Sequence, residues 1–156
     1  MPDTNRHELL ITRLFDAPRE LVYACWTDPE HLARWGGAPE GLTVVVEEQD
    51  IRVGGSYRIC MRSPEGDEYR LQGVYRELVA PEKIVFTHAW VLQDGTSAPE
   101  TLVTILLEKS ENGTELIFRQ TGLPSRDARA GHEEGWRSTF DRLGAFLADY
   151  LSTVRD

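Results

Sequence analysis

The stretch Gly131–Ser152, near the end of the chain, constrains the fold more than any other part of the sequence. Apolar residues recur in it at steps of four and three, at Trp136, Phe140, Leu143, Leu147 and Tyr150. This spacing is typical of one apolar stripe along an α-helix whose other face meets water. Because the residues between 43 and 121 have the pattern of strands and hairpins, we expect this helix to lie against a sheet.

Two glycines, Gly135 and Gly144, interrupt the expected helix. Each glycine weakens a helix by about 1 kcal/mol relative to alanine. Glycine at these two positions is explained if the helix backbone must come close to a neighbouring element, or if space must be left beside the helix. A long helix clasped by a sheet, with an internal cavity between them, would leave such a space, and an ordinary amphipathic core helix is the alternative.

The composition excludes several functions. The chain has 156 residues, enough for one domain with a real core, and carries a net charge of −9. Without a cluster of lysines and arginines it is a poor candidate for nucleic-acid binding. No apolar run approaches the ~20 residues that a membrane-spanning helix needs. We therefore expect no nucleic-acid partner and no membrane span.

The N-terminus and the cysteines bear on location. The opening residues, MPDTNRHELL, lack the basic and apolar regions of a secretion signal. Cys25 and Cys60 fall on segments that are expected to form the core, so we interpret them as buried free thiols in a reducing compartment. The sequence thus predicts a cytoplasmic protein.

Strand patterns dominate the part of the chain before the long helix. Residues 1–8 are expected to be a flexible lead-in, followed by a single domain over residues 9–152. Strands are expected at Leu9–Asp16, Leu42–Ile51, Ser56–Ser63, Glu68–Val79, Ile84–Leu92, Glu100–Lys109 and Thr114–Thr121. Turn residues separate the last six, which predicts successive hairpins and an antiparallel meander. Several strands are apolar on both parities, so the inward face of each stays open.

Two short helices are expected between the first strand and the second. Pro18 stands at the expected first helical position, where its missing N–H costs nothing. Asp28 is expected to cap the second helix, and Gly36-Gly37 to end it. These helices would close one end of a curved sheet.

Several short motifs, in order along the chain, resemble those of a known family. They are Phe15-Asp16-Ala17-Pro18 with Val22, Trp26-Thr27-Asp28-Pro29, Trp35, Val53-Gly54-Gly55-Ser56-Tyr57, Gly73-Val74-Tyr75-Arg76-Glu77, Pro81-Glu82-Lys83-Ile84-Val85-Phe86, and Gly135-Trp136 with Leu143. Together they are similar to the homologues of the activator of the heat-shock-protein-90 ATPase, in the START-like (SRPBCC, Bet v 1-like) superfamily. The resemblance covers about residues 9–151.

The resemblance implies an α+β helix-grip fold. A strongly curved antiparallel sheet of six or seven strands would wrap round the long C-terminal helix, with two short helices after the first strand. An apolar cavity would lie between the sheet and the helix. The motifs are motifs of fold and name no substrate.

Motifs of catalysis and of metal binding are missing from the sequence. It contains no HExxH, no CxxC, no Gly-x-Ser-x-Gly, no phosphate loop and no dinucleotide fingerprint. We therefore expect no cofactor, no metal and no identifiable catalytic residue. His88, between Phe86 and Trp90 on one strand parity, could be a hydrogen-bonding handle or a general base in an apolar cavity. A histidine satisfied by a neighbouring polar group is the alternative.

Aromatic and aliphatic side chains with a few polar groups are typical of a small-molecule pocket. Its floor is expected to come from the long helix, its walls from the strands, and its mouth from the region of Trp26 and Trp35. The candidate cavity residues are Trp26, Trp35, Tyr57, Ile59, Met61, Tyr69, Leu71, Phe86, His88, Trp90, Trp136 and Phe140. The same residues would also make a plain core.

Hypotheses of different kinds follow. The first is a module that binds a hydrophobic small molecule, such as a lipid, a polyketide-like compound or an aromatic compound. The second is a protein-interaction role, either a contact with a chaperone or a homodimer formed through a sheet face that includes Ile84–Leu92 and Thr101–Leu107. The third is a cyclase-like or hydratase-like enzyme, supported only by His88, the tyrosines and Arg58 or Arg70.

Overall fold

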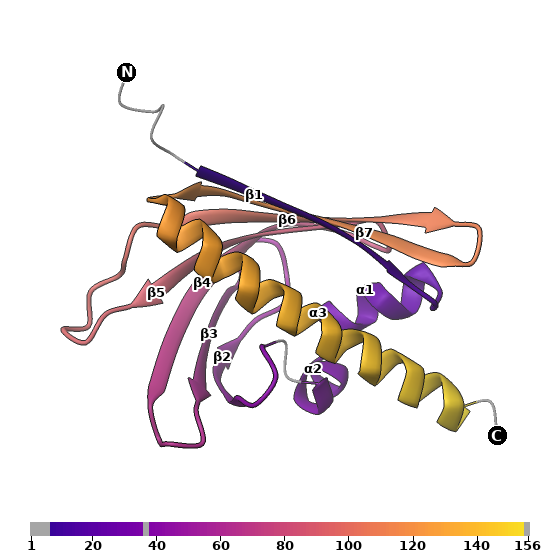
Figure 1. Cartoon of the computed structure of the whole chain (residues 1–156), viewed down its shortest axis with the longest axis horizontal. Helices are drawn as coiled ribbons and strands as arrows, with labels where there is room; N and C mark the ends of the chain where they lie inside the picture. The colour runs from indigo at the N-terminus through magenta and orange to yellow at the C-terminus, as the bar shows by residue number, and fades with distance from the viewer. Residues whose placement is uncertain (1–6, 36–37, 155–156) are drawn as a thin grey trace.

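A computed structural model describes residues 7–35 and 38–154 and has the expected α+β architecture, with a long helix crossing a curved sheet (Figure 1). The elements are β1 (His7–Phe15), α1 (Arg19–Thr27), α2 (Pro29–Trp35), β2 (Thr43–Gln49), β3 (Ser56–Arg62), β4 (Glu68–Val79), β5 (Lys83–Val91), β6 (Thr101–Ser110), β7 (Gly113–Leu123) and α3 (Arg126–Val154). The two short helices after the first strand are confirmed.

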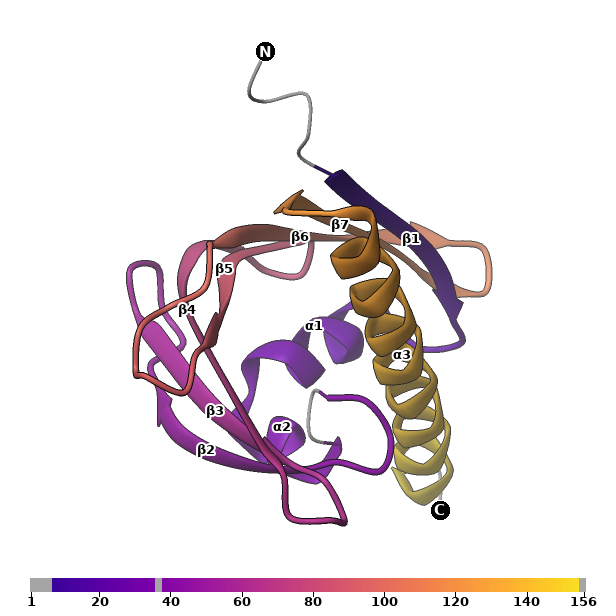
Figure 2. The ribbon, with the colours of Figure 1, turned by 60° about the vertical axis from the view of Figure 1, so that its left-hand side comes forward.

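The strands form one antiparallel sheet in the order β1-β7-β6-β5-β4-β3-β2. From β2 to β7 each strand pairs with its neighbour in sequence, which confirms the meander, and β1 closes the row against β7. Register shifts interrupt the pairing of β2 with β3 and of β4 with β5, and such bulges bend a strand. The sheet accordingly curls round α1, α2 and α3 (Figure 2), so the helix-grip arrangement is confirmed.

Several boundaries differ from the sequence-based expectation. β1 begins at His7, within the expected lead-in, and residues 1–6 lie outside the described part of the chain. Pro18 is not the first helical residue of α1 but the residue before it, because its ψ of 148° is extended. Asp28 caps α2 as expected, its Oδ1 accepting the Glu30 N–H at 2.9 Å. The expected helix end at Gly36-Gly37 lies outside the described residues.

The apolar stripe of α3 is directed at the core, as its spacing predicts. Phe140, Leu143 and Leu147 are buried, and Trp136 is half-buried against Phe118 of β7, with ring centroids 4.6 Å apart. At the far end of the helix, Tyr150 lies against His31 of α2 rather than against the sheet, at 5.2 Å. The stripe therefore joins α3 to the sheet and to the short helices.

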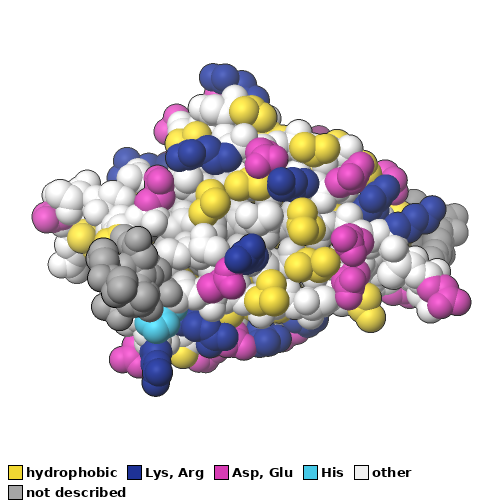
Figure 3. All heavy atoms as spheres, turned by 90° about the horizontal axis from the view of Figure 1, so that it is seen from above, with side chains coloured by type: hydrophobic (Ala, Val, Ile, Leu, Met, Phe, Trp, Pro, Cys, Tyr) yellow, Lys and Arg dark blue, Asp and Glu magenta, His cyan; other side chains and the backbone are white. Residues whose placement is uncertain are grey.

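The outer face of the sheet is a mixture of apolar and charged side chains. In Figure 3, seen over β1, β6 and β7, hydrophobic groups alternate with groups of both charges. Leu10, Leu14 and Leu102 are exposed, and the Arg119–Glu8 ion pair lies on the same face. The outward side chains of β5 (Val85, Thr87 and Ala89) are buried, so this strand does not provide the apolar patch that was expected of it. The homodimer stays a prediction.

Candidate functional site

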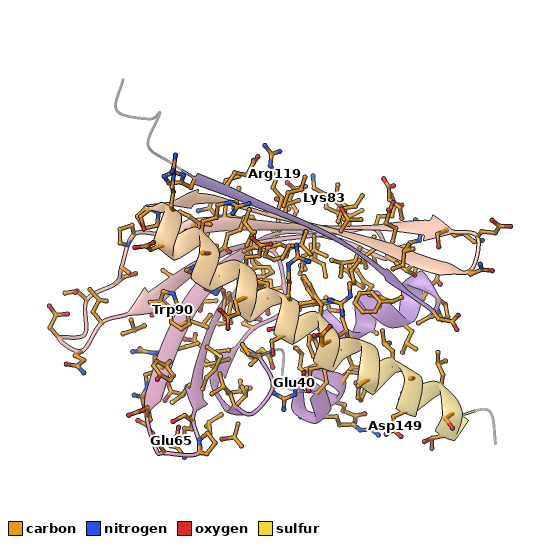
Figure 4. All side chains as sticks on the ribbon, viewed as in Figure 1. Glu40, Glu65, Lys83, Trp90, Arg119 and Asp149 are labelled. Atoms are coloured by element: carbon orange, nitrogen blue, oxygen red, sulfur yellow. The ribbon has the colours of Figure 1, made fainter. Side chains whose placement is uncertain are left out.

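A cavity of about 390 Å³ lies between the concave face of the sheet, the two short helices and the N-terminal half of α3. Most of the sequence-based candidates line it: Trp26, Tyr57, Ile59, Met61, Leu71, Phe86, His88, Trp90 and Trp136. They come from α1, β3, β4, β5 and α3, so the curvature of the sheet brings them together. Figure 4 shows Trp90 on β5, facing the N-terminal part of α3.

Trp35, Tyr69 and Phe140 do not line the cavity, which corrects the expectation for these residues. Trp35 is 1% exposed and donates its indole N–H to the Cys25 carbonyl oxygen at 2.8 Å. Phe140 is fully buried behind Trp136, with ring centroids 6.0 Å apart. Tyr69 is 46% exposed because it lies near the end of the β3–β4 hairpin, which extends past the helices to Glu65 in Figure 4.

The structure adds lining residues that the sequence analysis missed. They are Leu32, Pro39, Val44, Val46, Gln49, Tyr75, Ile84, Ala128, Gly131, His132, Gly135 and Thr139. A signal existed for part of α3, because steps of three and four from Trp136 lead to Thr139, His132 and Ala128. A signal also existed for Val44 and Val46, which share one face of β2.

The cavity opens between β2 and the N-terminal half of α3. Val46 and Gly131 are exposed there, and Pro39 is half-buried beside them. The expected mouth at Trp26 and Trp35 is wrong, because the two indoles pack edge to face at 5.0 Å and are both buried. Trp26 is part of the cavity wall, and Trp35 packs behind it.

The glycines of α3 have different roles. A Cβ on Gly131 would meet nothing within 4 Å, and one on Gly135 would meet only Pro39, at 3.7 Å. These glycines leave space at the mouth of the cavity, as one of the two explanations predicted. Gly144 lies beside Phe15 of β1, where a Cβ would come within 3.6 Å of the ring. It allows a close approach of helix to strand.

His88 is the most buried ionisable group of the cavity wall, with 5% of its surface exposed. Its ring lies 5.6 Å from Trp90, 5.8 Å from His132 and 5.8 Å from Trp136. Burial, and after it the neighbouring His132, lowers the pKa of His88 to about 3, against a hydrogen bond with its own backbone that raises it. The imidazole is therefore neutral at neutral pH.

His132, beside His88 in the cavity wall, makes a hydrogen-bond contact through each of its ring nitrogens. Nδ1 lies 2.8 Å from the carbonyl oxygen of Ala128, and Nε2 accepts the indole N–H of Trp90 at 3.3 Å. This pattern fits a neutral imidazole with its proton on Nδ1. The contact ties α3 to β5 at the mouth.

A buried chain of hydrogen bonds links four elements around the cavity. Trp136 donates its indole N–H to Oε1 of Gln120 at 3.0 Å, and Gln120 donates through Nε2 to the Thr101 hydroxyl at 2.9 Å. Thr101 in turn donates to the carbonyl oxygen of His88 at 2.9 Å. Gln120 is fully buried, so each of these bonds satisfies a group that water cannot reach.

The tyrosines at the inner end are also neutral. Tyr57 donates its hydroxyl to the Thr87 carbonyl oxygen at 2.6 Å, and burial raises its pKa well above the ordinary value, with Tyr75 and Glu100 adding to the rise. Burial raises the pKa of Tyr75 as well, although a hydrogen bond from Gln49 opposes it. The ring of Tyr57 passes over Gly73, where a Cβ would lie 2.6 Å from it. Only glycine fits there.

The cavity is apolar and uncharged. Within the described part of the chain, no Asp, Glu, Lys or Arg lines it, and no group of three or more His, Cys, Asp or Glu could hold a metal ion. The indole N–H of Trp26 is buried without a hydrogen-bond partner among the described residues. None of the described helices is both long enough and apolar enough to cross a membrane.

The loop between α2 and β2 is fastened over one side of the mouth by α3. Nη1 of Arg142 donates to the carbonyl oxygens of Ala38, Pro39 and Leu42, at 3.1 to 3.4 Å. The Glu40 N–H donates to the Ser138 hydroxyl at 3.0 Å, at the position where Figure 4 shows Glu40 beside α3. Since Pro39 lines the cavity, these bonds set the width of its mouth.

Replacing Arg142 with methionine is expected to lower the free energy of unfolding by about 1.5–3 kcal/mol, because a charged donor that serves three part-buried carbonyl oxygens is lost. Denaturant unfolding measures the change. Arg137→Met is the control, since Arg137 is exposed and only pairs with Glu133 one turn away, so its loss should cost about 0.5 kcal/mol or less. Equal effects of the two substitutions would contradict the role given to Arg142.

The fold and the cavity define a helix-grip protein with an internal apolar pocket. The family model described as Activator of Hsp90 ATPase homolog 1-like protein matches residues 16–148, and the chain belongs to this family. This confirms the resemblance inferred from the motifs. No curated protein matches the chain.

Solved structures agree with this assignment. The chain is similar to the AHSA1 protein of Silicibacter pomeroyi, with 29% identity and a TM-score of 0.82, over 91% of this chain and 98% of that one. It is similar to protein CV1439 of Chromobacterium violaceum, with 31% identity and a TM-score of 0.81, over 90% and 96%. A protein from Arthrobacter aurescens matches with 28% identity and a TM-score of 0.81, over 91% and 86%.

Proposed function

We propose that this protein binds a hydrophobic small molecule in the cavity between α3 and the sheet. The observation that carries the proposal is the open apolar cavity of about 390 Å³ lined by aromatic rings. Pockets of roughly 300–1,000 Å³ with apolar walls and a few polar groups are typical small-molecule sites. The buried thiols of Cys25 and Cys60 support the further proposal that the protein works in a reducing, cytoplasmic setting.

The physical reason for binding is the removal of apolar surface from water. A ligand in the cavity would gain roughly 25 cal/mol for each Å² of apolar surface buried, less the cost of its lost freedom. Binding to the folded state alone raises the melting temperature as ligand concentration rises. A screen of apolar compounds by thermal shift is therefore the direct test of the function.

Gly131→Leu separates binding from stability. The new side chain would enter the space at the mouth and should weaken or abolish the thermal shift produced by a ligand. It should also stabilise the free protein by up to about 1 kcal/mol, because leucine favours a helix more than glycine does. If Gly131→Leu loses ligand binding but gains stability, misfolding of the variant cannot explain the loss of binding.

Ala130→Leu is the matched control for this variant. Ala130 is the preceding, exposed residue of α3 and does not line the cavity, so the same leucine there should leave the ligand-induced shift unchanged. If no compound shifts the melting temperature of the wild-type protein, or if Gly131→Leu and Ala130→Leu bind equally well, the proposed function is wrong.

A chaperone contact is a second candidate, favoured by the family description, which names an activator of the Hsp90 ATPase. It would be tested by adding the protein to Hsp90 and following ATP hydrolysis. Such a role would be unaffected by Gly131→Leu if it uses the outer face of the sheet, where Leu10, Leu14 and Leu102 are exposed. An unchanged hydrolysis rate would remove this candidate.

A further inference from the structure

We infer that the cavity selects a compact, uncharged ring compound with one hydroxyl group, which hydrogen-bonds His88, and rejects carboxylates and amines of the same shape. This inference rests on the proposed function and specifies its ligand. It is carried by the charge, the hydrogen-bond partners and the volume of the cavity.

Among the described residues, the cavity wall offers no counter-charge to an ionised ligand. No Asp, Glu, Lys or Arg lines the cavity among the described residues, and the nearby cations are already engaged. Arg58 and Arg70 of β3 and β4 pair with Glu47 on the other face of the sheet, and Arg142 is bonded to the carbonyl oxygens of the loop above the mouth. A carboxylate or ammonium group of a ligand would be buried here without a partner of opposite charge. Burying an unpaired charge costs far more free energy than burying a neutral group.

Several polar groups of the cavity wall already have hydrogen-bond partners within the protein. Tyr57 donates to Thr87, Trp136 to Gln120, and Thr139 to the carbonyl oxygen of Gly135. Trp90 donates to His132. These groups have no need of a ligand.

His88 and Trp26 differ from these groups. Within the described part of the chain, the imidazole of His88 makes ring contacts but no hydrogen bond to another residue, and the Trp26 N–H has no partner. A neutral imidazole provides one donor and one acceptor. Because the donor already bonds the backbone of His88 itself, the acceptor is left for a ligand, and a hydroxyl can donate to it without bringing a charge.

The size and shape of the cavity suit a flat ring compound. The volume of about 390 Å³ equals that of about 13 water molecules, which leaves room for one or two fused rings. The inner wall is aromatic, with Tyr57, Tyr75 and Phe86 packed at 5.5 to 6.3 Å from one another. Aromatic walls favour flat rings, through offset and edge contacts.

The test uses a matched ligand set at neutral pH: naphthylmethanol, naphthoate, naphthylmethylamine and naphthalene, each titrated into the wild-type protein by calorimetry. We expect naphthylmethanol to bind most tightly, and naphthoate and naphthylmethylamine to bind at least about 100-fold more weakly, because their charges would be desolvated without a partner. Equal binding of naphthoate and naphthylmethanol would overturn the inference and leave the proposed function standing. Binding of long-chain lipids but of none of these four would also overturn it. If no apolar compound of any kind binds, the proposed function itself fails.

The role of His88 is tested by comparing naphthylmethanol with naphthalene. His88→Leu should weaken naphthylmethanol by about 3- to 10-fold, the value of one hydrogen bond, and leave naphthalene unchanged. His88→Gln, which keeps a donor and an acceptor, should recover most of the affinity. An equal loss for both ligands would show that His88 only shapes the wall. If His88→Leu does not fold, the nitrogen chemical shifts of His88 in the wild-type protein decide, since naphthylmethanol should move them and naphthalene should not.

A charge placed at the mouth should change the selectivity. Val46 lines the cavity and is 44% exposed, and the preceding residue, Val45, is 40% exposed on the opposite face of β2. Val46→Lys should strengthen naphthoate binding at least about 10-fold by providing a cation within reach of the cavity. Val45→Lys should have no effect. The electrostatic argument is wrong if Val46→Lys does not raise the affinity for naphthoate. It is also wrong if Val45→Lys raises that affinity as much as Val46→Lys does.

Discussion

Replacing Trp136 with alanine is expected to lower the free energy of unfolding by about 3–5 kcal/mol, the usual cost of removing a large core aromatic. Its indole is half-buried and contacts the rings of Phe118, Phe140 and Trp26, at 4.6, 6.0 and 6.4 Å between centroids. The substitution also removes the indole N–H that donates a hydrogen bond to Oε1 of the fully buried Gln120. Chemical denaturation followed by circular dichroism measures the loss without depending on tryptophan fluorescence.

Trp136→Phe separates the two contributions. Phenylalanine keeps most of the ring packing but leaves Oε1 of Gln120 without its donor, so we expect a loss of about 1–3 kcal/mol. A loss below about 1 kcal/mol for Trp136→Ala would mean that α3 is held to the sheet by Phe140 and Leu143 alone, and the arrangement described for Trp136 would be wrong.

Acid is expected to destabilise the folded protein through His88. The ordinary pKa of the unfolded histidine is 6.5, and burial, with His132 as the second cause, lowers it to about 3 in the folded state. Between these values the unfolded chain takes up a proton that the folded chain does not. The free energy of unfolding therefore falls as the pH is lowered from about 6.5 toward 3, by about 2 kcal/mol at pH 5.

The measurement compares wild type with His88→Gln by denaturant unfolding at neutral pH and at pH 5. Carboxyl groups titrate in both proteins, so the difference between them isolates the histidine, and the variant should lose about 2 kcal/mol less than the wild type. His7→Gln, on β1 and outside the cavity, is the control and should keep the sensitivity of the wild type. Identical pH dependence in wild type and His88→Gln would show that His88 is not buried as described.

Local patterns were sufficient for much of the fold. The steps from Trp136 to Leu147 predicted the inward stripe of α3, because helical periodicity is a property of the sequence itself. The turn residues between the last six expected strands predicted the hairpins, since two strands joined by a short turn must pair as neighbours. β1 was expected from its own pattern, but its place beside β7 at the edge of the sheet was not, because a pairing across about 100 residues leaves no local mark.

The cavity was harder to predict than the fold. Phe86, His88 and Trp90 share one strand parity, and this parity does face the cavity, but the sequence left both parities of β5 open because both are apolar. Burial of a residue does not say whether it faces a void or a packed core. Trp35 and Phe140 are as apolar as Trp26, and yet they lie behind the wall, where side chains fill the space.

The sequence by itself determined the α+β class, the order of helices and strands and the family, because periodicity, turn residues and short motifs are local properties. Only the tertiary structure decided where the cavity opens, which side chains share it, and that no charged group lines it among the described residues. The physical reason is that these properties depend on the curvature of the sheet. That curvature brings Val46 of β2 and Gly131 of α3 into the lining of one cavity, and no local pattern encodes this meeting of two distant segments.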